Sequence, residues 1–223
     1  MKRDRLIDLS HPIEAGMTTY PGLPVPEITV LVEREASRAN YAPGVTFEID
    51  VMTLVGNTGS YVDSPFHRHA DGADLAAIPL ERLADVPAVR IDATSLGRAI
   101  GAEAFDGHEL AGRAVLVHTG HDRHWRTDAY ATDAPFLTLA AVERLVAEDA
   151  ALVGIDSINI DDMADRTRPA HSLLLGAGIP IAEHLANLGA VPVTGSFFTA
   201  LPAPVRAFAT FPVRAIVRVP GEA

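Results

Sequence analysis

Alternating apolar and polar positions along this chain predict more strands than helices. Val45, Phe47, Ile49 and Val51 alternate with polar residues, which is typical of a strand with one buried face. From position 211 to 219, apolar residues at every second position alternate with residues that include Arg214 and Arg218, which predicts a closing strand. Short apolar runs bounded by turn residues predict further strands at positions 6–9, 28–32, 89–91, 114–117 and 152–155.

Helical spacing is rarer. Apolar residues recur at intervals of three and four between positions 139 and 146, and Thr138 is a suitable N-cap for that helix. A short helix is expected at 79–83, whereas 156–170 is polar and irregular. Many short strands with one or two helices predict a strand-rich α/β fold, and the absence of a linker favours a single domain over residues 1–223.

The stretch from Gly56 to His69 interrupts the strand pattern. It holds a carboxylate, two imidazoles, a phenol, an amide and three aliphatic hydroxyls within fourteen residues. Gly59 and Pro65 disfavour regular structure through it. Such a stretch suits a solvated loop, and it equally suits a site presented where a strand runs into a turn.

The composition of the chain argues against several classes of partner and metal ligand. The 223 residues carry a formal net charge of −11, which argues against a nucleic-acid partner because no basic face is available for phosphates. The chain has no cysteine, so a metal would need histidine or oxygen ligands. No signal peptide or membrane-length apolar run is apparent, which leads us to expect a soluble, cytoplasmic protein without a membrane partner.

Two of the nine histidines are better placed for chemistry than the others. His67 follows Asp63 by four residues in the polar stretch, and His171 ends the irregular segment twelve residues before Glu183. Other groups are weaker. We interpret three acidic residues as belonging to a solvated loop: Asp156, Asp161 and Asp162. Side chains that could contact a substrate, or equally pack as ordinary core, are Tyr20, Phe66, His121 and Trp125.

The segment from Asn57 to His67 resembles the signature of the cyclase family of metal-dependent hydrolases, which includes bacterial kynurenine formamidase and isatin hydrolase. That signature reads His-x-Gly-Thr-His-x-Asp-x-Pro-x-His. Further landmarks similar to those of the family follow in the same order: Asp8–Pro12, Tyr20–Gly22, Val117–Gly120, Gly154–Ser157, His171 and Glu183. The resemblance implies a swivelling β/β/α domain, a small-molecule substrate and a homodimer or homotetramer.

The same resemblance implies a metal site and reveals a departure from it. Asn57 and Tyr61 stand where metal-binding members of the family have histidine ligands. An amide is a poor zinc ligand, and a phenol with a pKa of about 10 binds a metal well only after losing its proton. The family ligands that remain are Asp63, His171 and Glu183, which would suit one divalent ion, zinc or manganese.

Three functions are compatible with these residues. In the first, one ion and its water hydrolyse an amide, lactam or ester-like bond, with His67 moving protons and Asn57 and Tyr61 hydrogen-bonding in the pocket. In the second, His67, Asp63 and Tyr61 form a metal-free acid–base cluster for a cyclisation, dehydration or isomerisation. The third is a small-molecule binder without turnover.

Overall fold

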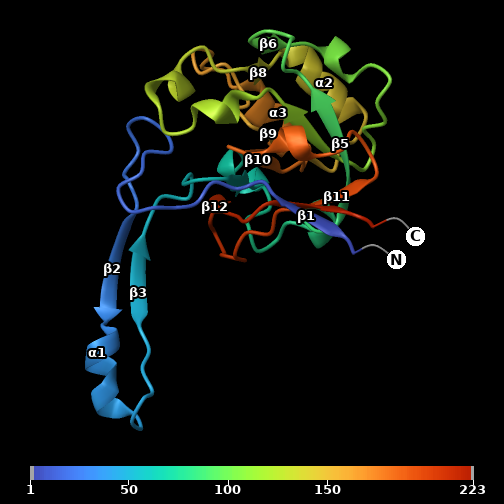
Figure 1. Ribbon diagram of the computed structural model, residues 1–223. Coiled ribbons are helices and arrows are strands. Elements are labelled where there is room, and N and C mark those ends of the chain that lie inside the picture. Colours follow the sequence, from blue (N-terminus) through green and yellow to red (C-terminus); the bar gives the residue numbers. More distant parts are fainter. Residues whose placement is uncertain (1–2, 222–223) are drawn as a thin grey trace.

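The computed structural model describes residues 3–221, and its centre is a curled, mixed sheet of nine strands (Figure 1). The strands lie in the order β1 (Arg5–Asp8), β13 (Ile216–Val219), β11 (Ser196–Thr199), β5 (Val86–Asp92), β7 (Ala114–His118), β9 (Leu152–Ile155), β10 (Ile181–Glu183), β4 (Tyr61–Asp63) and β12 (Thr210–Pro212). β5, β7, β9 and β10 run parallel, and the flanking strands pair antiparallel.

Both faces of the parallel strands are buried, which explains their continuous apolar sequences. In β7, Val115 and Val117 pack into the core beneath the helices, whereas Ala114 and Leu116 belong to a second core on the opposite face. Successive side chains of a strand point to opposite faces, so each core takes every second residue.

Two helices cover one face of this sheet (Figure 1). α2 (Leu139–Ala147) begins at Thr138, whose hydroxyl accepts from the backbone N–H of Ala141, as predicted. α3 (Pro169–Gly176) packs beside α2 and was not evident from the sequence. Short 3-10 turns complete the body: η2 (Pro65–His67), η3 (Leu80–Arg82), η4 (Ala102–Phe105), η5 (His121–His124), η6 (Asp128–Ala131) and η7 (Leu188–Ala190). Another such turn, η1 (Arg38–Asn40), lies outside the body in a projecting hairpin.

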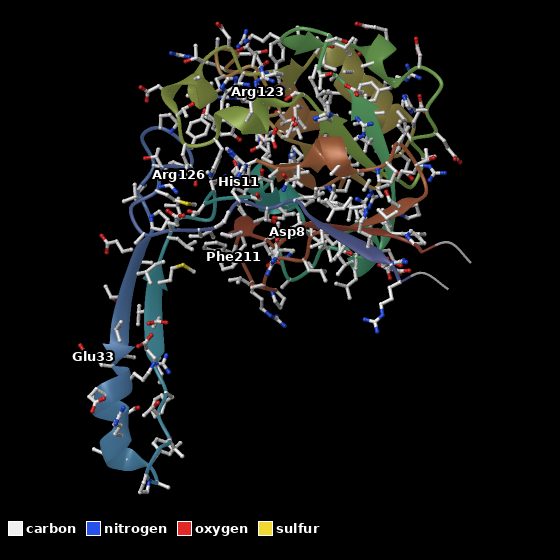
Figure 2. The ribbon with its side chains drawn as sticks, in the orientation of Figure 1. Asp8, His11, Glu33, Arg123, Arg126 and Phe211 are labelled. Carbon is white, nitrogen blue, oxygen red and sulfur yellow. The ribbon has the colours of Figure 1, made fainter. Side chains whose placement is uncertain are left out.

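A two-stranded hairpin projects from the body (Figure 1). It consists of β2 (Glu27–Val32) and β3 (Ile49–Thr53), with the short helix α1 (Arg34–Ser37) near its tip, where Figure 2 shows Glu33. All of β3 is exposed, so the prediction of a half-buried strand over 45–51 was wrong in both its extent and its burial. A second small pair is formed by β6 (Ala99–Ile100) and β8 (Phe136–Leu137).

The predicted closing strand is in fact two strands. β12 pairs with β4 at one edge of the sheet, whereas β13 pairs with β1 and β11 near the other edge. Between them, the N–H of Val213 donates to Ser60 and that of Ala215 donates to the Ser10 hydroxyl, which ends the first strand. Among residues 3–221, no helix combines the length and the apolar character needed to cross a bilayer.

Candidate active site

Most of the polar stretch is buried, from Thr58 to Pro65, and its residues Tyr61–Asp63 form strand β4 of the sheet. β4 pairs antiparallel with β10, and Tyr61 lies directly opposite Glu183. Opposed residues in an antiparallel pair share a face, and so do residues two apart, which places the side chains of Tyr61, Asp63 and Glu183 on one side of the sheet. All three are buried. Just before β4, a Cβ on Gly56 would clash with the carbonyl oxygen of Thr210, so this close approach requires glycine.

His171 completes a group of metal-binding type from α3. One ligand atom from each of Asp63, His171 and Glu183 lies within 4.8 Å of the others. His171 Nε2 is 3.8 Å from both Asp63 Oδ2 and Glu183 Oε1. Asp63 Oδ2 is buried and has no hydrogen-bond partner among the described residues. A buried carboxylate oxygen without a partner is costly, and its position among two further ligand atoms fits a cation.

The protonation of His171 reflects the same concentration of negative charge. Burial alone would lower its pKa, but the carboxylates of Glu183, Asp161 and Asp63 raise it to about 10. Burial raises the pKa of Glu183 to about 7. Without an ion, the imidazolium therefore supplies the compensating positive charge, and a divalent cation would displace its Nε2 proton.

Asp161 orients His171. Its carboxylate accepts the Nδ1 proton of His171 at 2.6 Å and the backbone N–H groups of Ala170 and His171 at 2.6 and 3.1 Å. Because Nδ1 donates to Asp161, Nε2 is the nitrogen that faces Asp63 and Glu183, an arrangement like the carboxylate–histidine pairs of metal sites. Asp161 is 2% exposed and Asp156 is fully buried, so the interpretation of both as solvated loop residues was wrong.

Tyr61 is a hydrogen-bond donor to Glu183. Its hydroxyl lies 2.6 Å from Glu183 Oε2 and 3.2 Å from His184 Nε2, and Tyr130 approaches His184 Nδ1 at 2.9 Å. Burial, followed by the charge of Glu183, raises the pKa of Tyr61 well above its usual value. Burial lowers the pKa of His184 to about 3, so this ring is neutral. The bonds therefore run in one direction, from Tyr130 through His184 and Tyr61 to Glu183.

His67 is connected to the group through Thr210. The Thr210 hydroxyl donates to Asp63 Oδ1, and its oxygen lies 3.1 Å from His67 Nδ1. A hydroxyl whose proton is already donated can only accept from the ring, so Nδ1 carries the hydrogen and Nε2 keeps a free lone pair. The side chain of His67 is 32% exposed, which leaves that nitrogen within reach of a ligand.

A cavity of about 270 Å³ gathers most of the predicted residues. The predicted residues in its wall are Tyr20, Asn57, Tyr61, His67, His171 and Glu183. Four further residues line it that the sequence did not single out: Leu23, Arg68, Asn159 and Arg168. No sequence pattern linked these four, because they come from three separate loops.

Three of the predicted substrate contacts lie away from this cavity. His121 is buried and its Nε2 is 2.9 Å from the Tyr130 carbonyl oxygen. Trp125 stacks on His11, with ring centroids 4.0 Å apart. Phe66 is half-buried in η2 and its N–H donates to Ala73. Figure 2 shows His11 close to where the N-terminal loop meets the η5–η6 region.

Comparison with known proteins supports the fold and the family. The family model described as "Putative cyclase" matches residues 7–162, more than half of the chain. A kynurenine formamidase of Bacillus cytotoxicus is 28% identical over 219 residues, covering 98% of this chain and 99% of the relative. Two solved structures share the fold. An isatin hydrolase bound to the product analogue thioisatinate has a TM-score of 0.82 at 22% identity, covering 98% of this chain and 94% of its own. A potential metal-dependent hydrolase with cyclase activity has a TM-score of 0.81 at 24% identity, and the match covers 98% of this chain and 100% of that structure's chain.

Proposed function

The chain belongs to the cyclase family, and from this premise we propose that it is a metal-dependent hydrolase that cleaves an amide, lactam or ester-like bond of a small molecule. Relatives named kynurenine formamidase span nearly the whole chain, which supports action on a C–N bond. The observation that carries the proposal is the buried, unpartnered Oδ2 of Asp63, facing His171 Nε2.

We infer that Asp63, His171 and Glu183 hold one zinc or manganese ion. One imidazole with two carboxylates is a common ligand set for a catalytic ion. When bound, such an ion supplies Lewis acidity, which polarises a carbonyl group and makes a water more acidic. Tyr61 keeps its proton, directed at Glu183, so it fixes the orientation of that carboxylate and does not act as an anionic ligand.

His67 is the proposed general base and acid. Its Nε2 lone pair accepts the proton of the attacking water, and the same nitrogen then returns a proton to the leaving amine. Thr210 holds the ring in the tautomer that this role needs. The Asn57 side-chain amide lines the same cavity and is our candidate donor to the oxyanion that develops during attack.

A second candidate is a metal-free acid–base reaction, such as a cyclisation or dehydration. It is favoured by the imidazolium of His171, whose pKa of about 10 allows it to balance the carboxylates without an ion. In that reaction His67 would be the base and Tyr61 a proton donor.

Metal content, measured in the wild type and in Asp63→Asn, separates these functions. Under the hydrolase proposal, elemental analysis of the purified protein finds about one zinc or manganese ion per chain, and Asp63→Asn abolishes both binding and hydrolysis of formanilide. The matched control is Asp162→Asn, because Asp162 is an acid of the neighbouring loop that pairs with Arg98. A protein that binds no divalent ion yet converts a substrate would support the second candidate, and a ligand bound without turnover would support a binding protein.

We also infer a homodimer or homotetramer formed through the hairpin. Its apolar side chains lie on both faces, because Ile28 pairs with Met52 and Thr29 with Val51 in the adjacent register. Leu31 is 66% exposed and Met52 is 51% exposed. An isolated hairpin is barely stable in water, and exposed apolar surface of this kind marks an interface. A second copy of the chain would cover both faces.

A further inference from the structure

Two arginines line the cavity beside the proposed reaction centre. Arg68 follows His67 directly, and Arg168 precedes α3, two residues before the Asp161-bonded N–H of Ala170. Arg68 Nη2 donates to the carbonyl oxygen of Thr167 at 3.2 Å. Thr167 is the residue before Arg168, so Arg68 is held against the segment that carries Arg168, and both arginines line the same cavity.

Neither guanidinium has a carboxylate partner within 4.0 Å among the described residues. Arg68 donates to the Ser172 hydroxyl and to a backbone carbonyl. Arg168 donates to Asn159 Oδ1 at 3.2 Å and to the carbonyl oxygens of Asp162 and Met163 at 3.4 Å. Neutral acceptors hold the groups in place and leave their charge unbalanced, in a chain whose net charge is −11.

Two acidic residues shortly before Arg168 in the chain are already engaged elsewhere. The Asp162 carboxylate forms an ion pair with Arg98 at 2.6 Å. The Asp165 carboxylate accepts from the N–H and the hydroxyl of Thr167 at 2.8 and 2.7 Å. An anion that enters the cavity would therefore meet two positive groups without having to displace an existing ion pair.

The position of Arg168 is locally unfavourable. Its backbone is left-handed, with φ 49° and ψ 61°, and it precedes Pro169. A positive side chain at the start of a helix also opposes the helix dipole. Asn, Gly or Ser would suit this position better, and choices that conflict with local preference are expected at functional sites.

We propose that Arg68 and Arg168 form a carboxylate-binding subsite, so that the amide cleaved by this enzyme carries a carboxylate group. The inference rests on the proposed hydrolase function and names its substrate class. The planar fork of a guanidinium matches the two oxygens of a carboxylate. Tyr20 and Leu23 line the rest of the cavity and offer apolar contacts, and a volume of about 270 Å³ suits a small molecule.

A matched pair of amides tests the subsite in the metal-loaded enzyme. 4-Formamidobenzoate carries a carboxylate that formanilide lacks, and both have the same scissile bond. We expect kcat/KM to favour the anionic amide, and Arg68→Gln and Arg168→Gln each to reduce that preference roughly 10- to 100-fold, mainly through KM. Arg166→Gln removes the same charge from the same loop without touching the cavity, and it should leave the preference intact. Arg168→Lys keeps the positive charge but loses the planar guanidinium that can bind both carboxylate oxygens. It should therefore retain only part of the preference for the anionic amide.

Binding of benzoate, measured by titration calorimetry, separates this proposal from the hydrolase function. Benzoate that binds the wild type and the Arg166→Gln variant, but is lost in Arg68→Gln, supports the subsite even if no amide is hydrolysed. Hydrolysis of both amides at equal rates, unchanged in Arg68→Gln and Arg168→Gln, would overturn the subsite and leave the hydrolase standing. Inhibition of the enzyme by inorganic phosphate but not by benzoate would also overturn the proposal of a carboxylate-binding subsite. Arg68 has an ordinary backbone conformation, so its variant tests the proposal even if Arg168→Gln fails to fold.

Discussion

Thr210 Oγ1 lies 3.1 Å from His67 Nδ1, and this contact decides which nitrogen of the ring can act as a base. Since the Thr210 hydroxyl donates its proton to Asp63, the histidine must donate to it. A β12 residue far from the polar stretch in sequence thereby connects a proposed ligand to the proposed base. Without that contact the ring would populate both tautomers, and only one of them presents a lone pair to the cavity.

Thr210→Val should therefore lower kcat about 10- to 100-fold while the protein still folds, because valine has nearly the same shape and the hydroxyl is lost. Steady-state hydrolysis of formanilide measures the effect. Thr210→Ser keeps the hydroxyl and should retain most of the activity. Thr199→Val is the matched control, because it makes the same change in β11, outside the cavity, and it should leave kcat nearly unchanged. A Thr210→Val enzyme with normal kcat would show that the tautomer of His67 is set elsewhere.

Replacing Asn57 and Tyr61 together by histidine should raise metal affinity by an order of magnitude or more, because imidazole is a far better ligand than an amide or a protonated phenol. Elemental analysis and competition with a chelator would measure both the affinity and the number of ions per chain. Tyr130→Phe is the control, since it breaks the same chain of hydrogen bonds at the third bond from Glu183 and leaves Tyr61 in place. Unchanged affinity in the double variant would show that Asn57 and Tyr61 do not occupy ligand positions.

The sequence allowed the strands β5, β7 and β9 and the helix α2 to be predicted, because their apolar patterns and the Thr138 cap are local signals, but it did not indicate β10 or that these strands run parallel. It also indicated the proposed ligands Asp63, His171 and Glu183 through a family resemblance. Thr210, His184 and Tyr130 could not be found in this way, since each acts through a contact made only after folding. His184 adopts a left-handed backbone with φ 54°, which no propensity would have assigned to it.

The burial of the hairpin strand β3 was predicted wrongly from the sequence, and the reason is physical. Alternation at 45–51 predicts one buried face within a single chain, yet both faces of β3 are exposed in this chain. By our inference a second copy of the chain covers these faces, and an alternating pattern cannot show which molecule would provide the burial. The prediction of one strand over 211–219 was wrong for another reason. The alternation continues through Val213 and Ala215, but the N–H groups of these two residues do not take part in the strand pairing of β12 or β13.

His11 should give the folded protein an acid sensitivity that an ordinary histidine would not. Burial lowers its pKa to about 4, whereas the unfolded chain titrates near 6.5. The unfolded state therefore binds more protons between those pH values, so this contribution to stability is complete above about pH 6.5 and is lost as the pH falls toward 4. Because the ring is partly exposed, the size of the loss is reduced by solvent.

Trp125, the only tryptophan, reports on this titration because it stacks on His11. An imidazolium quenches a stacked indole, so fluorescence should fall with a midpoint near pH 4 in the wild type and stay flatter in His11→Gln. Urea unfolding at pH 7 and pH 5 should show a smaller loss of stability in that variant. His108→Gln, outside this cluster, is the control. A fluorescence midpoint near 6.5 would contradict the lowered pKa.

If the hairpin forms the interface of a homodimer or homotetramer, one charged side chain placed on it should weaken that assembly. Leu31→Glu places a carboxylate on a side chain that is 66% exposed in one chain and, by our inference, buried against a second copy. Light scattering after size exclusion should find the wild type as a dimer or tetramer and this variant shifted toward monomer, with little change in monomer folding. Leu80→Glu is matched to it, because Leu80 is 64% exposed but lies in η3, away from the hairpin. A monomeric wild type, or an equal response to both substitutions, would exclude the hairpin as the interface, since apolar surface buried between copies cannot take up an unpaired charge without cost.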